Sequence, residues 1–186
     1  MTHDPAVLPP GLPVPEDDGA AAHLPGLPVP SVALPATGGG TVDLAERSRG
    51  RRVVLFAYPR TGRPGQDPLP GWDDIPGARG CTPEACSFRD LAPEFAERGA
   101  EVYGLSTQSA ADQQEAATRL RLPYALLSDA GSAFAIPLRL PTFTAGGLRL
   151  LRRLTLLVHD GTIQRVLYPV FPPDRAAADA LRALDS

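Results

Sequence analysis

The sequence lacks two residue types completely. It contains neither lysine nor asparagine, so all 18 of its basic residues are arginine, which we interpret as a compositional bias of the source genome. The formal net charge is −3, and this gives no electrostatic support for binding nucleic acid. No apolar run approaches the roughly 20 residues that span a membrane. We therefore expect neither a nucleic-acid partner nor a membrane partner.

Cysteine and histidine are also scarce. The only cysteines are Cys81 and Cys86, and the histidines, His3, His23 and His159, are far from them in the sequence. Since a structural zinc site needs four ligands, we expect no metal cofactor. The N-terminus lacks the basic segment and apolar segment of a secretion signal. A chain of this kind fits a reducing compartment, where a disulfide is transient, and we expect a cytoplasmic protein.

The segment around the two cysteines is the most informative part of the chain. It reads Gly80-Cys81-Thr82-Pro83-Glu84-Ala85-Cys86-Ser87-Phe88-Arg89-Asp90. Thr82 is a good N-cap and Pro83 is favoured at the first helical position, so a helix is predicted to begin here. Because the N–H groups at a helix start carry partial positive charge, a thiol at this point ionises more easily. The pattern predicts a reactive Cys81.

The spacing of the two cysteines restricts how they can react with each other. In an intact helix, positions i and i+5 lie roughly 8–9 Å apart, whereas a disulfide needs Cα atoms within about 7 Å. A bond between Cys81 and Cys86 therefore requires the first turns to unwind. This favours a catalytic couple over a static crosslink. Taken alone, the spacing also fits two inert cysteines in the core.

The chain divides into an arm and one domain. Residues 1–26 are rich in proline and alanine, and the predicted domain covers residues 27–186. The apolar run Val53–Tyr58 is typical of a buried central strand. Residues 60–79 are dense in glycine and proline, include the only tryptophan, Trp72, and are predicted to form one long ordered loop.

The rest of the domain alternates between strands and helices. Further strands are expected over residues 32–34, 41–44, 101–106, 124–127, 148–158 and 162–169, the last two as a hairpin. Helices are expected over residues 110–120 and 173–184, the second beginning near Pro173. This order predicts an α/β fold with a central mixed sheet flanked by helices.

Five segments, in the same order, resemble the peroxiredoxin family. They are similar to its bacterioferritin-comigratory or PrxQ-type branch and comprise Val53–Pro59, Gly80–Asp90, Val102–Ser106, Leu122–Asp129 and Arg153–Val158. The resemblance runs from about Leu27 to the C-terminus and implies a thioredoxin-like fold. It implies an antioxidant oxidoreductase, a thiol peroxidase that reduces hydrogen peroxide and organic hydroperoxides. It implies no metal, haem or flavin.

The resemblance assigns roles to single residues. Cys81 matches the peroxidatic cysteine, which becomes a sulfenic acid, and Cys86 matches the resolving cysteine, which forms a transient disulfide with it. Thioredoxin or a similar dithiol would reduce this disulfide. Arg153 matches the arginine beside the thiolate, and Pro59 matches the proline that opens the active-site motif. Without the resemblance, Arg153 reads as an ordinary solvated arginine at a strand end.

The chain departs from the family pattern just before Cys81. Residues 60–79 stand where the family has only a handful of residues, and Ala78 stands where its motif has a threonine that holds the peroxide. Thr61 is our candidate replacement, with a backbone group or water as alternatives. Gly80 and Thr82 are further candidates for substrate binding. We expect the loop to form a lid or wall over Cys81. An exposed linker and a self-association patch are the alternatives.

Two other functions are compatible with the sequence. The first is a peroxide sensor or redox-interaction protein with poor turnover, caused by the altered loop. The second is a general disulfide reductase or isomerase, although the Cys-x-x-Cys spacing of that class is absent. We expect a monomer or a weak homodimer.

Overall fold

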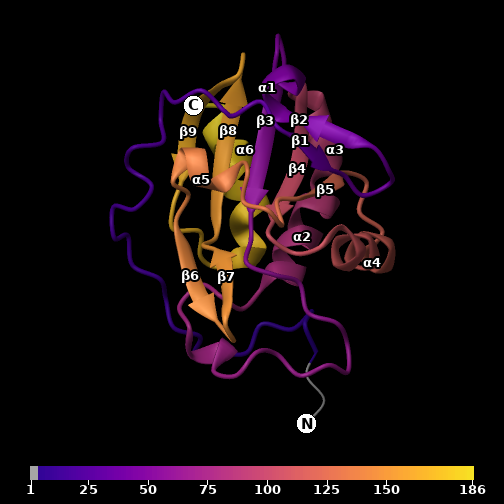
Figure 1. The fold of residues 1–186 in the computed structure, drawn as a ribbon, viewed down its shortest axis with the longest axis vertical. Helices are drawn as coiled ribbons and strands as arrows, with labels where there is room; N and C mark the ends of the chain where they lie inside the picture. The colour runs from indigo at the N-terminus through magenta and orange to yellow at the C-terminus, as the bar shows by residue number, and fades with distance from the viewer. Residues whose placement is uncertain (1–3) are drawn as a thin grey trace.

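The computed structural model describes residues 4–186, so His3 lies outside the described residues. Its centre is a five-stranded mixed sheet with strand order β5-β4-β3-β8-β9 (Figure 1). β3 and β4 are parallel, as are β4 and β5, while β8 is antiparallel to both β3 and β9. The strands are β3 (Arg52–Ala57), β4 (Ala100–Ser106), β5 (Ala125–Ser128), β8 (Leu154–His159) and β9 (Thr162–Leu167).

Central strand β3 is buried on both faces. Val54 and Phe56 belong to one hydrophobic cluster, and Val53 and Leu55 to the other. Successive side chains of a strand point to opposite faces, so a strand between two cores is apolar at every position. This explains the unbroken apolar run in the sequence. Phe56 stacks on Phe88 with ring centroids 4.4 Å apart, which fixes a helix to this strand.

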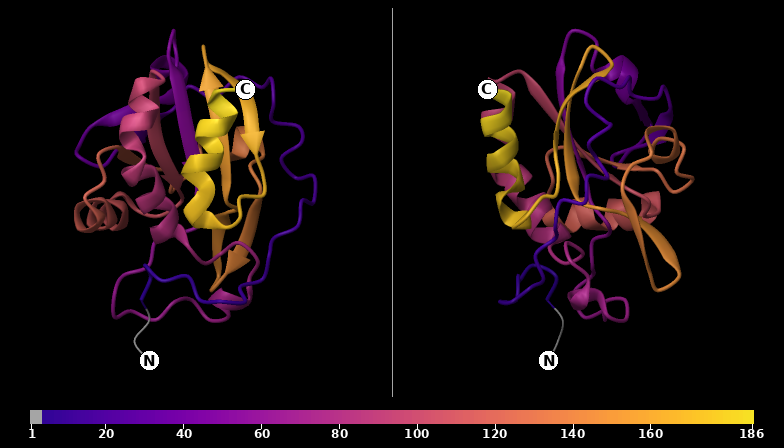
Figure 2. Two further views of the ribbon diagram at one scale, coloured as in Figure 1. Left: turned by 180° about the vertical axis from the view of Figure 1, so that it is seen from behind. Right: turned by 90° about the vertical axis from the view of Figure 1, so that its left-hand side faces the viewer.

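Helices cover one face of the sheet. α2 (Cys81–Asp90), α3 (Ala92–Glu97) and α6 (Ala176–Leu184) lie on this face, and Figure 2 shows α2 and α6 side by side. α4 (Ala110–Leu120) packs beside β5 and contributes Ala116 and Ala117 to the same hydrophobic cluster as Val54 and Phe56. Aromatic and alanine side chains fill the space between the sheet and these helices. This packing holds α2 against the sheet, with its start at one end of the strands (Figure 1).

The chain before β3 covers the opposite face together with α5 (Ala135–Leu138). Ala21 and Leu24, from the expected arm, are buried in this core. The division between an arm and a domain at residue 26 stays a prediction. The short elements outside the main sheet are β1 (Ala33–Pro35), β2 (Thr41–Asp43), α1 (Leu44–Arg47), η1 (Trp72–Asp74), β6 (Thr142–Ala145), β7 (Leu148–Leu151) and η2 (Pro173–Arg175).

The predicted strand over residues 148–158 was wrong in one respect. It is divided into β7 and β8, and β7 pairs with β6 in a separate hairpin. Gly146 and Gly147, with φ of 55° and 75°, form the tight turn of this hairpin. The break between β7 and β8 falls at Arg152 and Arg153. The hairpin of β8 and β9 is confirmed.

The predicted fold is confirmed as α/β with a central mixed sheet. The predicted helix over residues 110–120 agrees with α4, and its N-cap Ser109 accepts a hydrogen bond from the Asp112 N–H. The C-terminal helix begins later than expected, because residues from Pro173 form the 3₁₀ turn η2 before α6. Within residues 4–186, no helix has the length and apolar character that crossing a membrane requires.

Candidate active site

Helix α2 begins two residues earlier than the sequence suggested. Its N-cap is Gly80, with φ of 107°, and Cys81 is its first residue, so the prediction of Thr82 as N-cap was wrong. Glycine is favoured here for two reasons. The backbone is left-handed, and a Cβ atom would lie only 2.3 Å from the Pro173 Cγ and 2.9 Å from the Leu8 Cδ2. Packing therefore fixes the helix start on the N-terminal side of Cys81.

The Cys81 sulfur lies among polar groups in a buried position. Its side chain is only 4% exposed, and Arg153 Nη2 donates to Sγ across 3.3 Å. The backbone of Arg60 also acts to lower the pKa of the thiol. Arg153 is itself 3% exposed, so it is not a solvated arginine at a strand end. The structure thus brings Cys81 and Arg153 together from positions 72 residues apart.

Arg153 also holds the end of the inserted loop. Its Nη2 lies 3.3 Å from each of the carbonyl oxygens of Gly77, Ala78 and Arg79. Its Nη1 donates to the carboxylate of Glu84, which is fully buried. One guanidinium therefore connects the loop, α2 and the thiol, and it cannot move without disturbing all three.

Thr61 is held by a buried glutamine. The Thr61 N–H and Oγ1 donate to Gln108 Oε1 across 2.8 and 3.2 Å, and Gln108 Nε2 donates to the Thr61 carbonyl. The hydroxyl proton is used in this contact, so the Oγ1 lone pairs remain free to accept from a bound hydroperoxide. Sequence reasoning named Thr61 but missed Gln108, because nothing local marks a polar residue that follows a strand.

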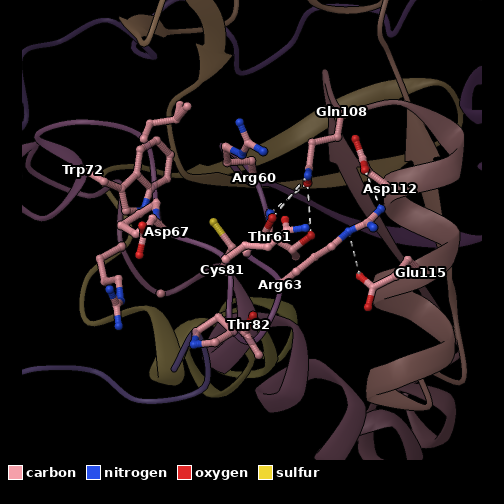
Figure 3. Close-up of a pocket in the computed structure, with 17 residues that line it drawn as sticks. Arg60, Thr61, Arg63, Asp67, Trp72, Cys81, Thr82, Gln108, Asp112 and Glu115 are labelled. Carbon is pink, nitrogen blue, oxygen red and sulfur yellow. Dashed lines mark hydrogen bonds and ion pairs between the residues drawn. The ribbon is translucent and has the colours of Figure 1, made fainter. Parts of the chain in front are cut away.

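A cavity of about 300 Å³ opens over Cys81 (Figure 3). The predicted substrate-binding residues Thr61, Gly80 and Thr82 all line it. Pro59 and Arg153 do not line it: Pro59 accepts from Ser106 Oγ behind the wall, and Arg153 contacts Cys81 from the buried side. The Thr82 hydroxyl is buried and has no hydrogen-bond partner among the described residues.

The inserted loop forms much of the cavity wall. Its residues from Arg60 to Trp72 supply the larger part of the lining. Trp72 is 6% exposed and packs against Phe143, with ring centroids 6.1 Å apart. The start of the chain closes this end of the molecule, since Arg79 Nη2 donates to the carbonyls of Asp4 and Val7. The loop forms the expected wall through its lining residues and the buried Trp72, while residues 64–68 within it are exposed to solvent.

Comparisons with known proteins identify the family. The profile of the Redoxin family matches residues 24–184. Peroxiredoxin Q of Sedum lineare, a chloroplastic protein, is 31% identical over 157 residues, which are 84% of this chain and 75% of the relative. The chain belongs to the peroxiredoxin family. Its similarity to peroxiredoxin Q proteins places it in the PrxQ or bacterioferritin-comigratory branch.

Further relatives of this peroxiredoxin support the assignment. Chloroplastic peroxiredoxin Q of Oryza sativa subsp. japonica is 32% identical over 161 residues, and this chain spans 66% of its length. The solved structure of the peroxidoxin BcpB from Mycobacterium tuberculosis superposes with a TM-score of 0.69. It is 32% identical, and the match covers 88% of this chain and 97% of the other. The predicted thioredoxin-like fold is confirmed.

Burial dominates the acid–base properties of the peroxiredoxin site. It raises the pKa of the Cys81 thiol, and although the Arg153 guanidinium opposes the shift, the nearby Glu84 carboxyl adds to it. The sequence had predicted an easily ionised thiol, but in this arrangement desolvation outweighs the helix start. Burial also raises the pKa of Glu84 to about 7, with Arg153 opposing. Glu84 was missed because a glutamate in the first helical turn usually faces solvent.

Replacing Glu84 with glutamine should lower the pKa of Cys81. Below pH 7 the Glu84 carboxyl is mostly neutral, and above that pH its charge opposes the Cys81 thiolate. We expect the Cys81 alkylation rate of Glu84→Gln to match the parent below pH 6 and to exceed it several-fold at pH 8, since one pKa unit is about a tenfold change in thiolate. The measurement is iodoacetamide reactivity against pH in a Cys86→Ser background. Superimposable profiles would contradict the role of Glu84.

Cys86 lies in the same unbroken helix of this peroxiredoxin. Both cysteines are free thiols, and Cys86 is half-buried. The Tyr124 hydroxyl donates to the Ala85 carbonyl across 2.6 Å, which adds a tertiary bond to the middle of α2. As the helical spacing indicated, a Cys81–Cys86 bond requires part of α2 to unwind. Among residues 4–186, no group of three or more acidic, histidine or cysteine side chains could hold a metal ion.

Proposed function

We propose that this peroxiredoxin is a thiol-dependent peroxidase that reduces hydrogen peroxide and organic hydroperoxides. The observation that carries the proposal is the contact between Arg153 Nη2 and the Cys81 sulfur at the base of the cavity. A fixed cation stabilises negative charge both on the thiolate and on the oxygen that leaves it. A cytoplasmic location and a monomer or weak homodimer remain predictions.

The first half of the proposed cycle oxidises Cys81. The thiolate attacks one oxygen of the peroxide, an S–O bond forms and the O–O bond breaks. The sulfur is oxidised to a sulfenic acid, and the leaving oxygen takes up a proton to become water or an alcohol. Arg153 is the donor placed at the sulfur, and the Arg60 backbone also favours the thiolate. Their fixed positions lower the barrier without reorganisation during the reaction.

The second half regenerates the thiol. After the start of α2 unwinds, the Cys86 thiolate attacks the Cys81 sulfenic sulfur, the S–S bond forms as the S–O bond breaks, and the hydroxide that leaves takes up a proton to become water. A dithiol partner such as thioredoxin then supplies two electrons by thiol–disulfide exchange. Cys86 is half-buried in the reduced protein, so the same unwinding also exposes the sulfur that the partner attacks.

Mass spectrometry after one equivalent of hydrogen peroxide tests this sequence of steps. The parent protein should lose two hydrogens and give a peptide in which Cys81 and Cys86 are linked. Cys86→Ser should instead gain one oxygen on Cys81, detectable as a dimedone adduct. An unmodified Cys81 in both proteins would refute the peroxidase proposal, whereas oxygen on Cys81 of the parent without a disulfide would refute only the role of Cys86.

A peroxide sensor with poor turnover is the second candidate function. The raised pKa of the buried Cys81 favours it, because a small thiolate fraction slows the reaction. A steady-state assay with thioredoxin and its reductase separates the two functions. Many turnovers per protein indicate the peroxidase. Oxidation of Cys81 without repeated turnover, together with capture of a partner protein by Cys86, indicates the sensor.

A further inference from the structure

The cavity over Cys81 is much larger than hydrogen peroxide requires. A water molecule occupies about 30 Å³ of liquid, whereas the cavity measures about 300 Å³. A volume of this order is at the lower end of the range of sites for small organic ligands. The inserted loop creates most of this space, with Leu69 and Trp72 as its apolar part. The wall therefore offers contacts that only a larger substrate would use.

The charged side chains around the cavity are not equivalent. Arg63 is ion-paired, with Nη2 2.8 Å from Asp112 Oδ1 and Nε 3.7 Å from Glu115 Oε2. Arg79 is ion-paired as well. The guanidinium of Arg60, in contrast, makes no hydrogen bond or ion pair with any residue between positions 4 and 186. Arg60 is thus a cation that the described protein leaves without a counterion.

The position of Arg60 relates this cation to the reacting atom. Arg60 and Cys81 line the same cavity, and the backbone of Arg60 is near enough to the thiol to lower its pKa. In Figure 3, the guanidinium lies between Trp72 and Gln108, on the side of the cavity toward which the sulfur points. Asp67 also lines the cavity, but it is exposed, and water screens its charge. Arg153 lies on the buried side of the thiol, so half-buried Arg60 is the cation without a partner among the described residues that lines the open cavity.

We propose that Arg60 is a specificity residue that binds the carboxylate of an organic hydroperoxide. The apolar part of the substrate would lie against Trp72 and Leu69, with its hydroperoxide group at the Cys81 sulfur. A guanidinium recognises a carboxylate with two parallel hydrogen bonds, which also orients the ligand. The reaction itself rests on the proposed peroxidase function, whereas carboxylate binding by Arg60 does not depend on it.

A binding experiment tests the carboxylate subsite without any chemistry. Trp72 is the only tryptophan, so its fluorescence reports on this cavity alone. Hexanoate and hexan-1-ol are titrated against the parent, Arg60→Gln and Arg49→Gln, with calorimetry as a second readout. Arg49 is exposed and does not line the cavity, so its variant controls for the change in net charge.

We expect the parent and Arg49→Gln to bind hexanoate at least about tenfold more tightly than hexan-1-ol, because a hydrogen bond to a charged group contributes about 1.5–3 kcal/mol. In Arg60→Gln the ratio should fall to near one. Equal affinities in the parent, a preserved ratio in Arg60→Gln, or no binding by either readout would overturn the subsite.

A kinetic experiment separates this inference from the peroxidase proposal. Rates of Cys81 oxidation are compared for 6-hydroperoxyhexanoate, its methyl ester and hydrogen peroxide. The acid should exceed the ester by about tenfold in the parent, and this preference should be lost in Arg60→Gln. If hydrogen peroxide oxidises Cys81 while acid and ester react equally, the subsite is wrong and the peroxidase stands. If hexanoate binds through Arg60 but no peroxide oxidises Cys81, the peroxidase is wrong and the subsite stands.

Discussion

Cys81→Ser should reduce peroxide consumption to the background rate, a loss of roughly a thousandfold or more. Cys81 is the only thiol that lines the cavity, and a serine hydroxyl is not ionised near neutral pH. The steady-state assay with a dithiol reductant measures the effect. Cys86→Ser removes the other thiol and leaves the cavity lining unchanged; it should also lose steady-state turnover, so it is the matched comparison for the first oxidation step.

The two variants should differ in a burst experiment. Cys86→Ser should consume about one equivalent of peroxide and then stop, because Cys81 is oxidised but not resolved. Cys81→Ser should show no burst at all. Normal turnover by Cys81→Ser would show that Cys81 is not the nucleophile, and half-buried Cys86 would then be the candidate.

Arg153→Met should slow the first oxidation of Cys81 by more than tenfold. Loss of the Nη2 contact removes the cation from the thiolate and from the leaving oxygen, and a factor of ten corresponds to about 1.4 kcal/mol. Stopped-flow oxidation by hydrogen peroxide measures the rate. Arg152→Met is the neighbouring control, because Arg152 stacks over Phe143 and makes no contact with the sulfur. An unchanged rate in Arg153→Met would leave Arg153 a structural role only.

Arg153→Met is also expected to lower the free energy of unfolding, so its stability has to be measured separately from its oxidation rate. Arg153 and Glu84 are both buried, so removing one partner leaves an uncompensated group, at a cost of about 3–5 kcal/mol when it is charged. The sequence alone predicts little loss of fold in Arg153→Met, because the burial of Arg153 and Glu84 is visible only in the structure. The double variant Arg153→Met with Glu84→Gln removes both charges. It should regain much of the lost stability in urea unfolding while the oxidation stays slow.

Periodicity predicted the elements whose burial is simple. Val53–Tyr58 is apolar throughout because both faces of β3 are covered. In residues 110–120 the buried side chains recur at helical spacing, because only one face of α4 is buried. The β6 and β7 hairpin and the short helix α5 were missed. Each has only four residues per element, so neither produces a detectable period, although Gly146-Gly147 was a usable turn signal.

The site was only partly predictable for a different reason. Cys81 and its helix are local features, and the resemblance supplied Arg153. Glu84 and Gln108 look like ordinary surface residues in the sequence, and only the fold shows that they are 0% and 9% exposed. Arg60 has no ion pair among the described residues because the fold places the nearby carboxylates of Asp112 and Glu115 against Arg63. Charge pairing of this kind is a long-range property that no window of sequence contains.

The placement of both cysteines within α2 has a consequence for the redox potential of the couple. A Cys81–Cys86 disulfide can exist only in a partly unwound segment, so it forgoes the helix packing and the Tyr124–Ala85 hydrogen bond that the dithiol form retains. Every 1.4 kcal/mol or so of this lost structure raises the reduction potential by about 30 mV. The fold thereby makes the disulfide a better electron acceptor, and the stability of one helix sets how readily a partner dithiol returns the protein to its reduced form.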